Sequence, residues 1–268
     1  MKTVLLISLL CSPVTALASD AYFVRFLSVG KSQGCLTILW RDDILFYNHT
    51  DSVATVRFLG VSNGPLPPRS ETLALPPHRM ISVNNSLVQW GQAGTLSDLR
   101  VVHLDIPSGV TAESRDEFYT QNSCILIQPP PLSLGKVSMP IFRTLTPSNI
   151  PQVILGSDLG GHGGRTNIGV YNAGATDAVA NIEVRRACDN ALIDSRSVII
   201  PADSIVQFTG FQKGSDATCS FSGWARYTVI TVDQPSLSYV ANITEGEGSG
   251  AGALAPTIEL AVAHNVVF

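Results

Sequence analysis

Short runs of β-branched and other apolar residues, separated by turn residues, dominate the hydrophobic pattern of the chain. Runs of about four to eight such residues, bounded by Pro, Gly, Asn or Asp, predict β-strands. No segment shows the 3.6-residue period of an amphipathic helix. We therefore predict an all-β protein, with strands over residues 53–59, 79–83, 100–104, 178–184, 197–200, 204–208, 227–232 and 237–243.

In the final segment, 258–268, the large apolar residues Ile258, Leu260, Val262, Val266 and Phe268 alternate with smaller or polar ones such as Glu259, Ala261 and Asn265. This alternation predicts one more strand. We favour an edge strand that completes the second half of the chain. The alternative is strand addition to a neighbouring subunit, which would make a homo-oligomer or filament.

Four blocks of sequence recur in the same order. Residues 40–48 align with 164–172, where Arg, Ile, Tyr and Asn coincide, and 53–56 align with 179–182. Residues 75–83 then align with 200–208, and 101–107 with 229–235. The offset drifts only from 124 at Arg41 and Arg165 to 128 at Pro107 and Pro235. This pattern predicts two copies of one domain.

The first residues have the three regions of a secretory signal peptide. Lys2 supplies the positive charge, residues 4–10 form a short apolar run, and Ala16 and Ala18 supply small residues for cleavage. The apolar run is far shorter than the roughly 20 residues of a membrane-spanning helix. We expect cleavage after Ala18 and no transmembrane helix in the mature protein.

The repeat and the signal peptide together predict the domain organisation. We expect a signal peptide at 1–18, β-sandwich domain 1 at 19–128, a Pro-rich linker at 129–139 and β-sandwich domain 2 at 140–268. Many short strands in units of little over 100 residues favour the immunoglobulin-like kind of sandwich. Pro129-Pro130-Pro131 makes the linker stiff.

Export would place an even set of cysteines in an oxidising compartment, because Cys11 leaves with the signal peptide. Four cysteines allow three connectivities. We favour Cys35–Cys124 and Cys188–Cys219, which keep each disulfide inside one half of the chain. The competing zinc site would use close Cys-x-x-Cys pairs, and the sequence has none.

Composition narrows the function classes. Charged residues make up 14% of the 268 residues and the formal net charge is -4. So few cations do not provide the surface that neutralises phosphates, which argues against nucleic-acid partners. The 45% hydrophobic content supports a core and argues against disorder.

One stretch carries a family resemblance. Gly-Gly-Arg-Thr-Asn-Ile-Gly-Val-Tyr-Asn at 163–172, followed by Ala-Val-Ala-Asn-Ile-Glu-Val and Ile-Pro-Ala-Asp-Ser, resembles tandem immunoglobulin-like β-sandwich repeats of uncharacterised secreted bacterial surface proteins. The resemblance covers both halves and is weaker in the first. It implies an extracellular protein used for spacing, adhesion or assembly, and it carries no catalytic residues.

The Gly-rich segment 158–164 is the best candidate binding loop. Its backbone amides and His162, followed by Arg165, suit an anion or a metal. A phosphate loop would also need a following Lys-Ser/Thr and a helix, and here a predicted strand follows. An ordinary inter-strand loop is therefore the favoured interpretation.

Trp90 and Trp224 are candidates for a sugar-binding platform, although large aromatic residues more often pack in a core. None of the five histidines lies in a catalytic or metal motif. Asp105 and Asp233 recur before a proline in separate domains, which favours a structural role. We expect no enzyme activity, cofactor or metal.

We therefore expect a secreted or cell-surface protein, with the periplasm as an alternative location. The predicted role is structural or adhesive, exerted through loops and strand edges and including self-assembly. The alternative function is carbohydrate binding, for example a surface glycan bound by an accessory module of an extracellular enzyme system.

Overall fold

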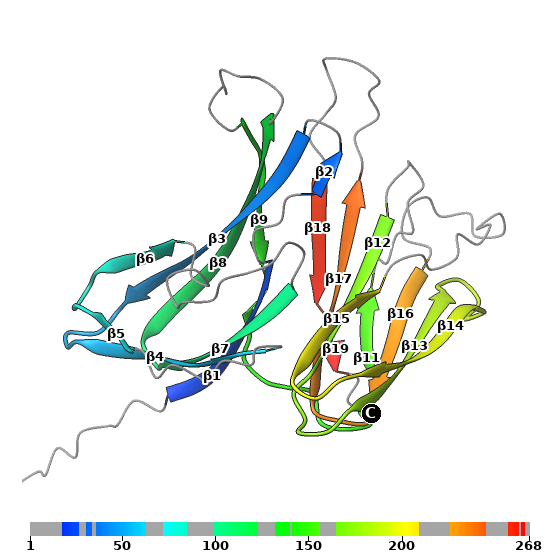
Figure 1. Cartoon of the computed structure of the whole chain (residues 1–268). Coiled ribbons are helices and arrows are strands. Elements are labelled where there is room, and N and C mark those ends of the chain that lie inside the picture. The colour runs from blue at the N-terminus through cyan, green and yellow to red at the C-terminus, as the bar shows by residue number, and fades with distance from the viewer. Residues whose placement is uncertain are drawn as a thin grey trace, which may run out of the picture.

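The computed structural model describes residues 18–26, 31–33, 36–62, 72–84, 99–122, 132–139, 141–155, 165–208, 226–244, 257–262 and 264–265 (Figure 1). This part of the chain is all-β, and every strand pairing in it is antiparallel. Among these residues, no helix is long and apolar enough to cross a membrane.

The first half of the chain forms two sheets. Sheet A1 has the order β10-β1-β7-β4-β5, and sheet B1 has the order β2-β3-β8-β9 with β6 also paired to β3. The bounds are β1 Ala18–Phe26, β2 Lys31–Gln33, β3 Leu36–Asn48, β4 Ala54–Val61, β5 Thr72–Leu75, β6 Met80–Asn84, β7 Leu99–Pro107, β8 Val110–Asn122, β9 Leu132–Met139 and β10 Ile141–Phe142.

The second half repeats this arrangement. Sheet A2 has the order β19-β11-β16-β13-β14, and sheet B2 has the order β15-β12-β17-β18. The bounds are β11 Gln152–Leu155, β12 Arg165–Asn172, β13 Ala178–Arg186, β14 Leu192–Ile200, β15 Ser204–Phe208, β16 Arg226–Val232, β17 Ser236–Thr244, β18 Thr257–Val262 and β19 His264–Asn265. Strand for strand, A2 corresponds to A1. B2 corresponds to B1 except for the short strand β2, which has no counterpart among the described residues of the second half. This is the arrangement that an internal repeat predicts.

The strand order differs from that of a constant-type immunoglobulin domain. There the first strand shares a sheet with the second and fifth, and the last shares one with the third and sixth. Here the first strand, β1, is in the sheet of β4 and β7, and β8 is in the sheet of β3 and β6.

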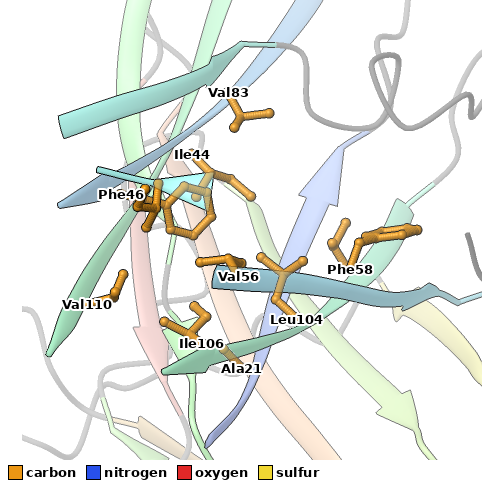
Figure 2. Close-up of a cluster of buried hydrophobic side chains, with 11 residues drawn as sticks. Ala21, Ile44, Phe46, Val56, Phe58, Val83, Leu104, Ile106 and Val110 are labelled. Carbon is orange, nitrogen blue, oxygen red and sulfur yellow. The ribbon is translucent and has the colours of Figure 1, made fainter. Parts of the chain in front are cut away.

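Each half buries its own core between its two sheets. In the first half, Phe46 of sheet B1 packs in one cluster with Phe58 and Leu104 of sheet A1 (Figure 2). In the second, Ile168 of B2 packs with Ile182 and Ile230 of A2. Alternate residues of each strand face these cores, as the strict buried–half-buried alternation along β16 shows.

The prediction of a linker at 129–139 is wrong for residues 132–139. Residues Leu132–Met139 form β9, which pairs with β8. Only residues 143–151 separate β10 of the first half from β11 of the second. The three prolines suggested a stiff spacer, but the residues after them alternate as a strand does.

The predicted last strand is confirmed in part, because it divides between two sheets. Its first part, β18, is the edge strand of B2, and its second part, β19, pairs with β11 in A2. The first half shows the same division between β9 and β10.

Several sequence expectations fall outside the described residues. Residues 1–17 of the expected signal peptide are among them, and so are Cys35, Cys124 and Cys219. Cys188, in the turn between β13 and β14, is disulfide-bonded. Both favoured pairings stay predictions.

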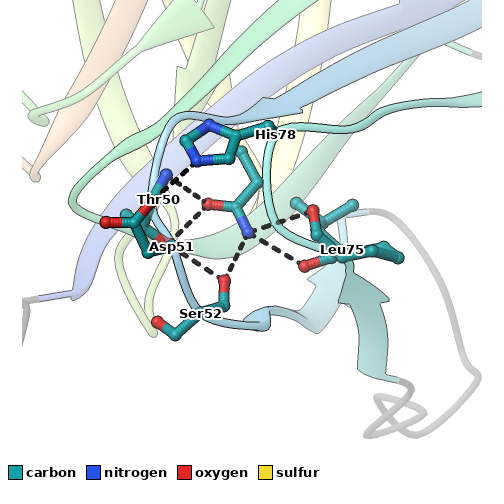
Figure 3. A network of polar contacts seen from close by, with 7 residues as sticks. Thr50, Asp51, Ser52, Leu75 and His78 are labelled. Atoms are coloured by element: carbon teal, nitrogen blue, oxygen red, sulfur yellow. Dashed lines mark hydrogen bonds and ion pairs between the residues drawn. The ribbon is translucent and has the colours of Figure 1, made fainter.

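A buried asparagine amide holds the same turn in each half. Asn48 Nδ2 donates to the carbonyl oxygens of Ser52 (2.7 Å), Leu75 (3.0 Å) and Pro76 (3.2 Å) (Figure 3). Asn172 Nδ2 donates to the corresponding oxygens of Thr176 (2.8 Å), Ile200 (3.1 Å) and Pro201 (3.1 Å). Both side chains are fully buried. We call these two sets of contacts the asparagine pins.

The pins correct the alignment of two sequence blocks. Leu75 and Ile200 correspond, and they pair with Ala54 and Ala178. Val56 therefore corresponds to Ala180, two residues before the Ile182 that the sequence alignment matched to it. Phe58 then corresponds to Ile182, so their partners Leu104 and Ile230 also correspond.

The last block shifts for the same reason. Asp105 corresponds to Thr231 rather than to Asp233. The sequence alignment matched the two Asp-x-Pro motifs, which lie at different distances from the next strand. In the first copy Ser108 and Gly109 separate Pro107 from β8, whereas in the second copy β17 begins directly after Pro235.

We predict that Asn172→Ala lowers the free energy of unfolding by about 2–4 kcal/mol, because it removes the donor of three carbonyl oxygens, that of Ile200 in a buried contact and those of Thr176 and Pro201 in part-buried ones. Asn172→Asp should cost at least as much at pH 7, since a carboxylate cannot donate to these oxygens. Urea denaturation measures both. The control Asn181→Ala, at an exposed position, should change stability by less than about 0.5 kcal/mol. Equal effects of the alanine variants would contradict the structural role of the pin.

Candidate interaction surface

A third set of buried apolar side chains lies outside both cores. Its members point away from the core of their own half, on the outer faces of sheets A1 and B2. They are Tyr22, Val101 and Phe142 from A1, and Tyr171, Ile205, Leu237 and Tyr239 from B2. We call this set the junction.

The two outer faces meet at the junction. The rings of Tyr22 and Tyr171 lie 6.4 Å apart, and β7 contacts β15. His103 stacks on Tyr22 with ring centroids 4.4 Å apart, and its Nε2 lies 3.0 Å from Asp20 Oδ1. On the other side, the Tyr171 hydroxyl donates to Asp203 Oδ1 at 2.7 Å. Ring stacking on His103 therefore positions Tyr22, and a hydrogen bond to Asp203 positions Tyr171.

Sheet B2 is shaped for this contact by a glycine. Tyr239 lies opposite Gly169, and a Cβ on that glycine would overlap the Cε1 atom of the Tyr239 ring. The tyrosine ring thus crosses its neighbouring strand, and its hydroxyl donates to Gln207 Oε1 on β15 at 2.9 Å. Any larger residue at 169 would push the ring out of the sheet surface.

Burial changes the proton affinity of both junction tyrosines. Desolvation raises the pKa of Tyr22, and the charge of Asp20 raises it further. Desolvation raises the pKa of Tyr171 strongly, with additional contributions from the hydrogen bond to Asp203, the charge of Asp203 and Tyr22. Both phenols are therefore neutral at physiological pH.

A small pocket opens beside the junction. Its volume is about 120 Å³, and its lining residues are Phe142, Arg143, Thr144, Thr146, Gln152, Leu237 and Ser238. Gln152 Nε2 donates to Ser236 Oγ at 2.9 Å, so this amide holds β11 against β17. The pocket has the volume of a few water molecules.

The first half carries the equivalent of the B2 face on the outer face of sheet B1. Tyr47 corresponds to Tyr171 because each precedes its pin asparagine. Met80 corresponds to Ile205, since each pairs with that tyrosine across the strands. Tyr47 is 37% exposed and Met80 65%, whereas Tyr171 is 6% and Ile205 4% exposed. The same face is thus covered in one half and open in the other.

The sequence-predicted site residues do not meet at this surface. Arg165 is the first residue of β12, and its backbone pairs with Ile243. His162, Trp90 and Trp224 lie outside the described residues. Within the described ranges, no group of three or more His, Cys, Asp or Glu side chains could hold a metal ion. Sequence reasoning missed the junction, although a tyrosine shared by both copies at 47 and 171 was a usable signal.

Comparisons with known proteins identify no family. No family model matches the chain, and no curated protein matches it. Among solved structures, the apo form of a lectin from Pleurotus ostreatus is 10% identical, with 96% of this chain and 81% of that chain covered and a TM-score of 0.18. The same lectin in complex with GalNAc is 11% identical, with 94% and 79% covered and a TM-score of 0.18. TM-scores this low establish no shared fold.

The repeat offers a matched test of the junction. We predict that Ile205→Ala lowers the free energy of unfolding by about 2–4 kcal/mol, because it leaves a cavity in a buried contact. The equivalent Met80→Ala should cost less than about 0.5 kcal/mol in the monomer, since Met80 is exposed. Chemical denaturation at low protein concentration compares the two. Similar losses for both variants would contradict a buried junction.

The Tyr171 pKa predicts a dependence of stability on alkaline pH. A phenol whose folded-state pKa is raised contributes stability that is complete below its unfolded value of 10.0 and is lost as pH rises towards the folded value. Above pH 10, Tyr171→Phe should therefore lose stability less steeply than the wild type, by up to about 1.4 kcal/mol per pH unit. Denaturation between pH 8 and pH 11.5 measures the slopes. Parallel slopes would show that Tyr171 ionises freely in the folded protein.

Proposed function

We propose that the protein is a secreted structural or adhesive protein built from two tandem β-sandwich domains of an immunoglobulin-like kind, with a strand order that differs from that of a constant-type domain. The domains act through loops and strand edges, outside the cytoplasm or at the cell surface. The proposal assigns the protein no catalytic activity.

The observation that carries this proposal is the repeated architecture. Both halves have corresponding sheets, corresponding asparagine pins and separate cores. The buried junction fixes the halves against each other. A rigid pair of β-sandwiches suits a spacer that presents loops and edges at a set separation, and β14 offers a nine-residue edge in sheet A2.

Carbohydrate binding stays the alternative expected from the sequence, through Trp90 and Trp224. No contact of the described residues favours it over the structural role. Glycan-array binding that is lost in Trp90→Ala and Trp224→Ala, with no association with cells or surfaces, would replace the structural proposal.

Expression in a secretion-competent bacterial host tests the location. We expect a processed protein that begins at Ser19 and is found outside the cytoplasm, as shown by intact mass and fractionation. Ala16→Arg and Ala18→Arg should block processing, because the cleavage site needs small residues at these positions. Thr15→Ala is the matched control and should be processed normally. An unprocessed cytoplasmic wild-type protein would contradict the proposal.

Binding assays test the role itself. The purified mature protein should adhere to cells of its source or to itself in pull-down and surface-binding measurements. A protein that is exported but binds neither cells nor itself would contradict the structural and adhesive assignment.

A further inference from the structure

The junction joins two different kinds of face. On one side is the outer face of an A-type sheet, with the row Tyr22, His103 and Phe142 across β1, β7 and β10. On the other is the outer face of a B-type sheet, with the row Tyr171, Ile205 and Leu237 across β12, β15 and β17. The contact is therefore heterologous, like that between successive subunits of a head-to-tail assembly.

A repeat with such a contact leaves one face of each kind open. The open B-type face is that of B1, where Tyr47 and Met80 stand in the positions of Tyr171 and Ile205. The same face also carries the charged residues Asp43, Glu113 and Arg115, next to Leu45 and Tyr47 in the strand register. Arg115 makes an ion pair with Glu113 of the same strand at 2.8 Å, and His49 packs edge-on against Tyr47.

The open A-type face is that of A2. Val153 and Val229 pair across β11 and β16 as Tyr22 and His103 pair across β1 and β7. The corrected alignment makes these rows equivalent, because Leu104 corresponds to Ile230 and His103 therefore to Val229. Both valines are half-buried on the outer face. Next to them on the same face, Glu183 is bound by Arg185 at 2.8 Å. The third position of this row, that of Phe142, is held by His264, which pairs with Val153. Two of the three positions are therefore apolar, and the neighbouring Glu183 is paired with Arg185.

We propose that a second copy of this chain docks the outer face of its sheet A2 on the outer face of sheet B1, in the manner of the internal junction. Val153 and Val229 of one molecule then cover Tyr47 and Met80 of the next. Each molecule keeps one open face of each kind, so the contact continues as an open head-to-tail filament. The inference deepens the proposed structural role and specifies sheet faces, rather than strand edges, as the assembly surface.

Analytical ultracentrifugation of the full mature protein over a concentration series tests this docking. The wild type should form dimers and longer species. Met80→Glu should weaken association at least tenfold by placing a charge on the B1 face, and Val229→Lys should do the same on the A2 face.

The Val229→Lys variant should still fold, because the introduced ammonium group would lie opposite Glu183 and form a favourable cross-strand pair. Val53→Glu, at a 62% exposed position in the turn after β3, is the matched control and should associate as the wild type does.

Mixing the two face variants gives the decisive result. Met80→Glu keeps an intact A2 face and Val229→Lys keeps an intact B1 face, so the mixture should form a 1:1 dimer and nothing longer. A two-fold dimer through B1 alone would instead leave Val229→Lys fully associated and give no new species on mixing. That pattern would overturn the proposal.

Two other outcomes would also overturn it. One is a wild type that stays monomeric at all concentrations, and the other is association that neither face variant weakens. The second would leave the strand-edge form of the proposed function standing. Thermal melts of each variant are the folding control. A transition near that of the wild type shows that the loss of association comes from the altered face and not from unfolding. If a variant melts early, Met80→Lys or Val153→Lys replaces it on the same face.

Discussion

The asparagine pin is the contact on which each half of the structure depends. The pin joins two turns between the sheets: the Ser52 carbonyl lies where the chain leaves B1 for A1, and the Leu75 and Pro76 carbonyls lie where it returns from A1 to B1. Asn48 supplies two amide hydrogens that three carbonyl oxygens share, and its own Oδ1 accepts from the Thr50 backbone at 2.9 Å. Because the amide and its contact with Leu75 are buried, water replaces the amide poorly, and the two sheets are held in register at this corner.

The same pin sets the conformation of a second turn. After Pro76 and Pro201 the chain passes through a left-handed residue, His78 with φ 52° and Asp203 with φ 47°. Neither is glycine, so the turn is held by contacts. His78 Nε2 lies 2.8 Å from Asp51 Oδ1, and Asp203 accepts from Tyr171. In the second half this turn therefore also orients a junction tyrosine, which couples the corner of the sandwich to the contact between the halves.

Sequence periodicity predicted the strands whose apolar residues face a core. The strand expected at 204–208 is β15, and that expected at 178–184 lies within β13. Strand β8 was missed because Glu113, Arg115, Asp116 and Glu117 interrupt any apolar run. Its pairing with thirteen consecutive residues of β3 comes from tertiary context, which local propensity does not record.

The interaction surface could not be predicted from hydrophobicity, because it depends on what lies outside each sheet. Tyr47 and Tyr171 occupy the same position in the repeat, and only the neighbouring half makes one buried and the other exposed. Duplication of a domain copies a face but not its surroundings. In the described part of the chain, the halves join through one unlike pair of faces, A1 with B2, and Tyr47 and Met80 of B1 stay exposed. A heterologous contact that does not close on itself leaves one face of each kind at its two ends.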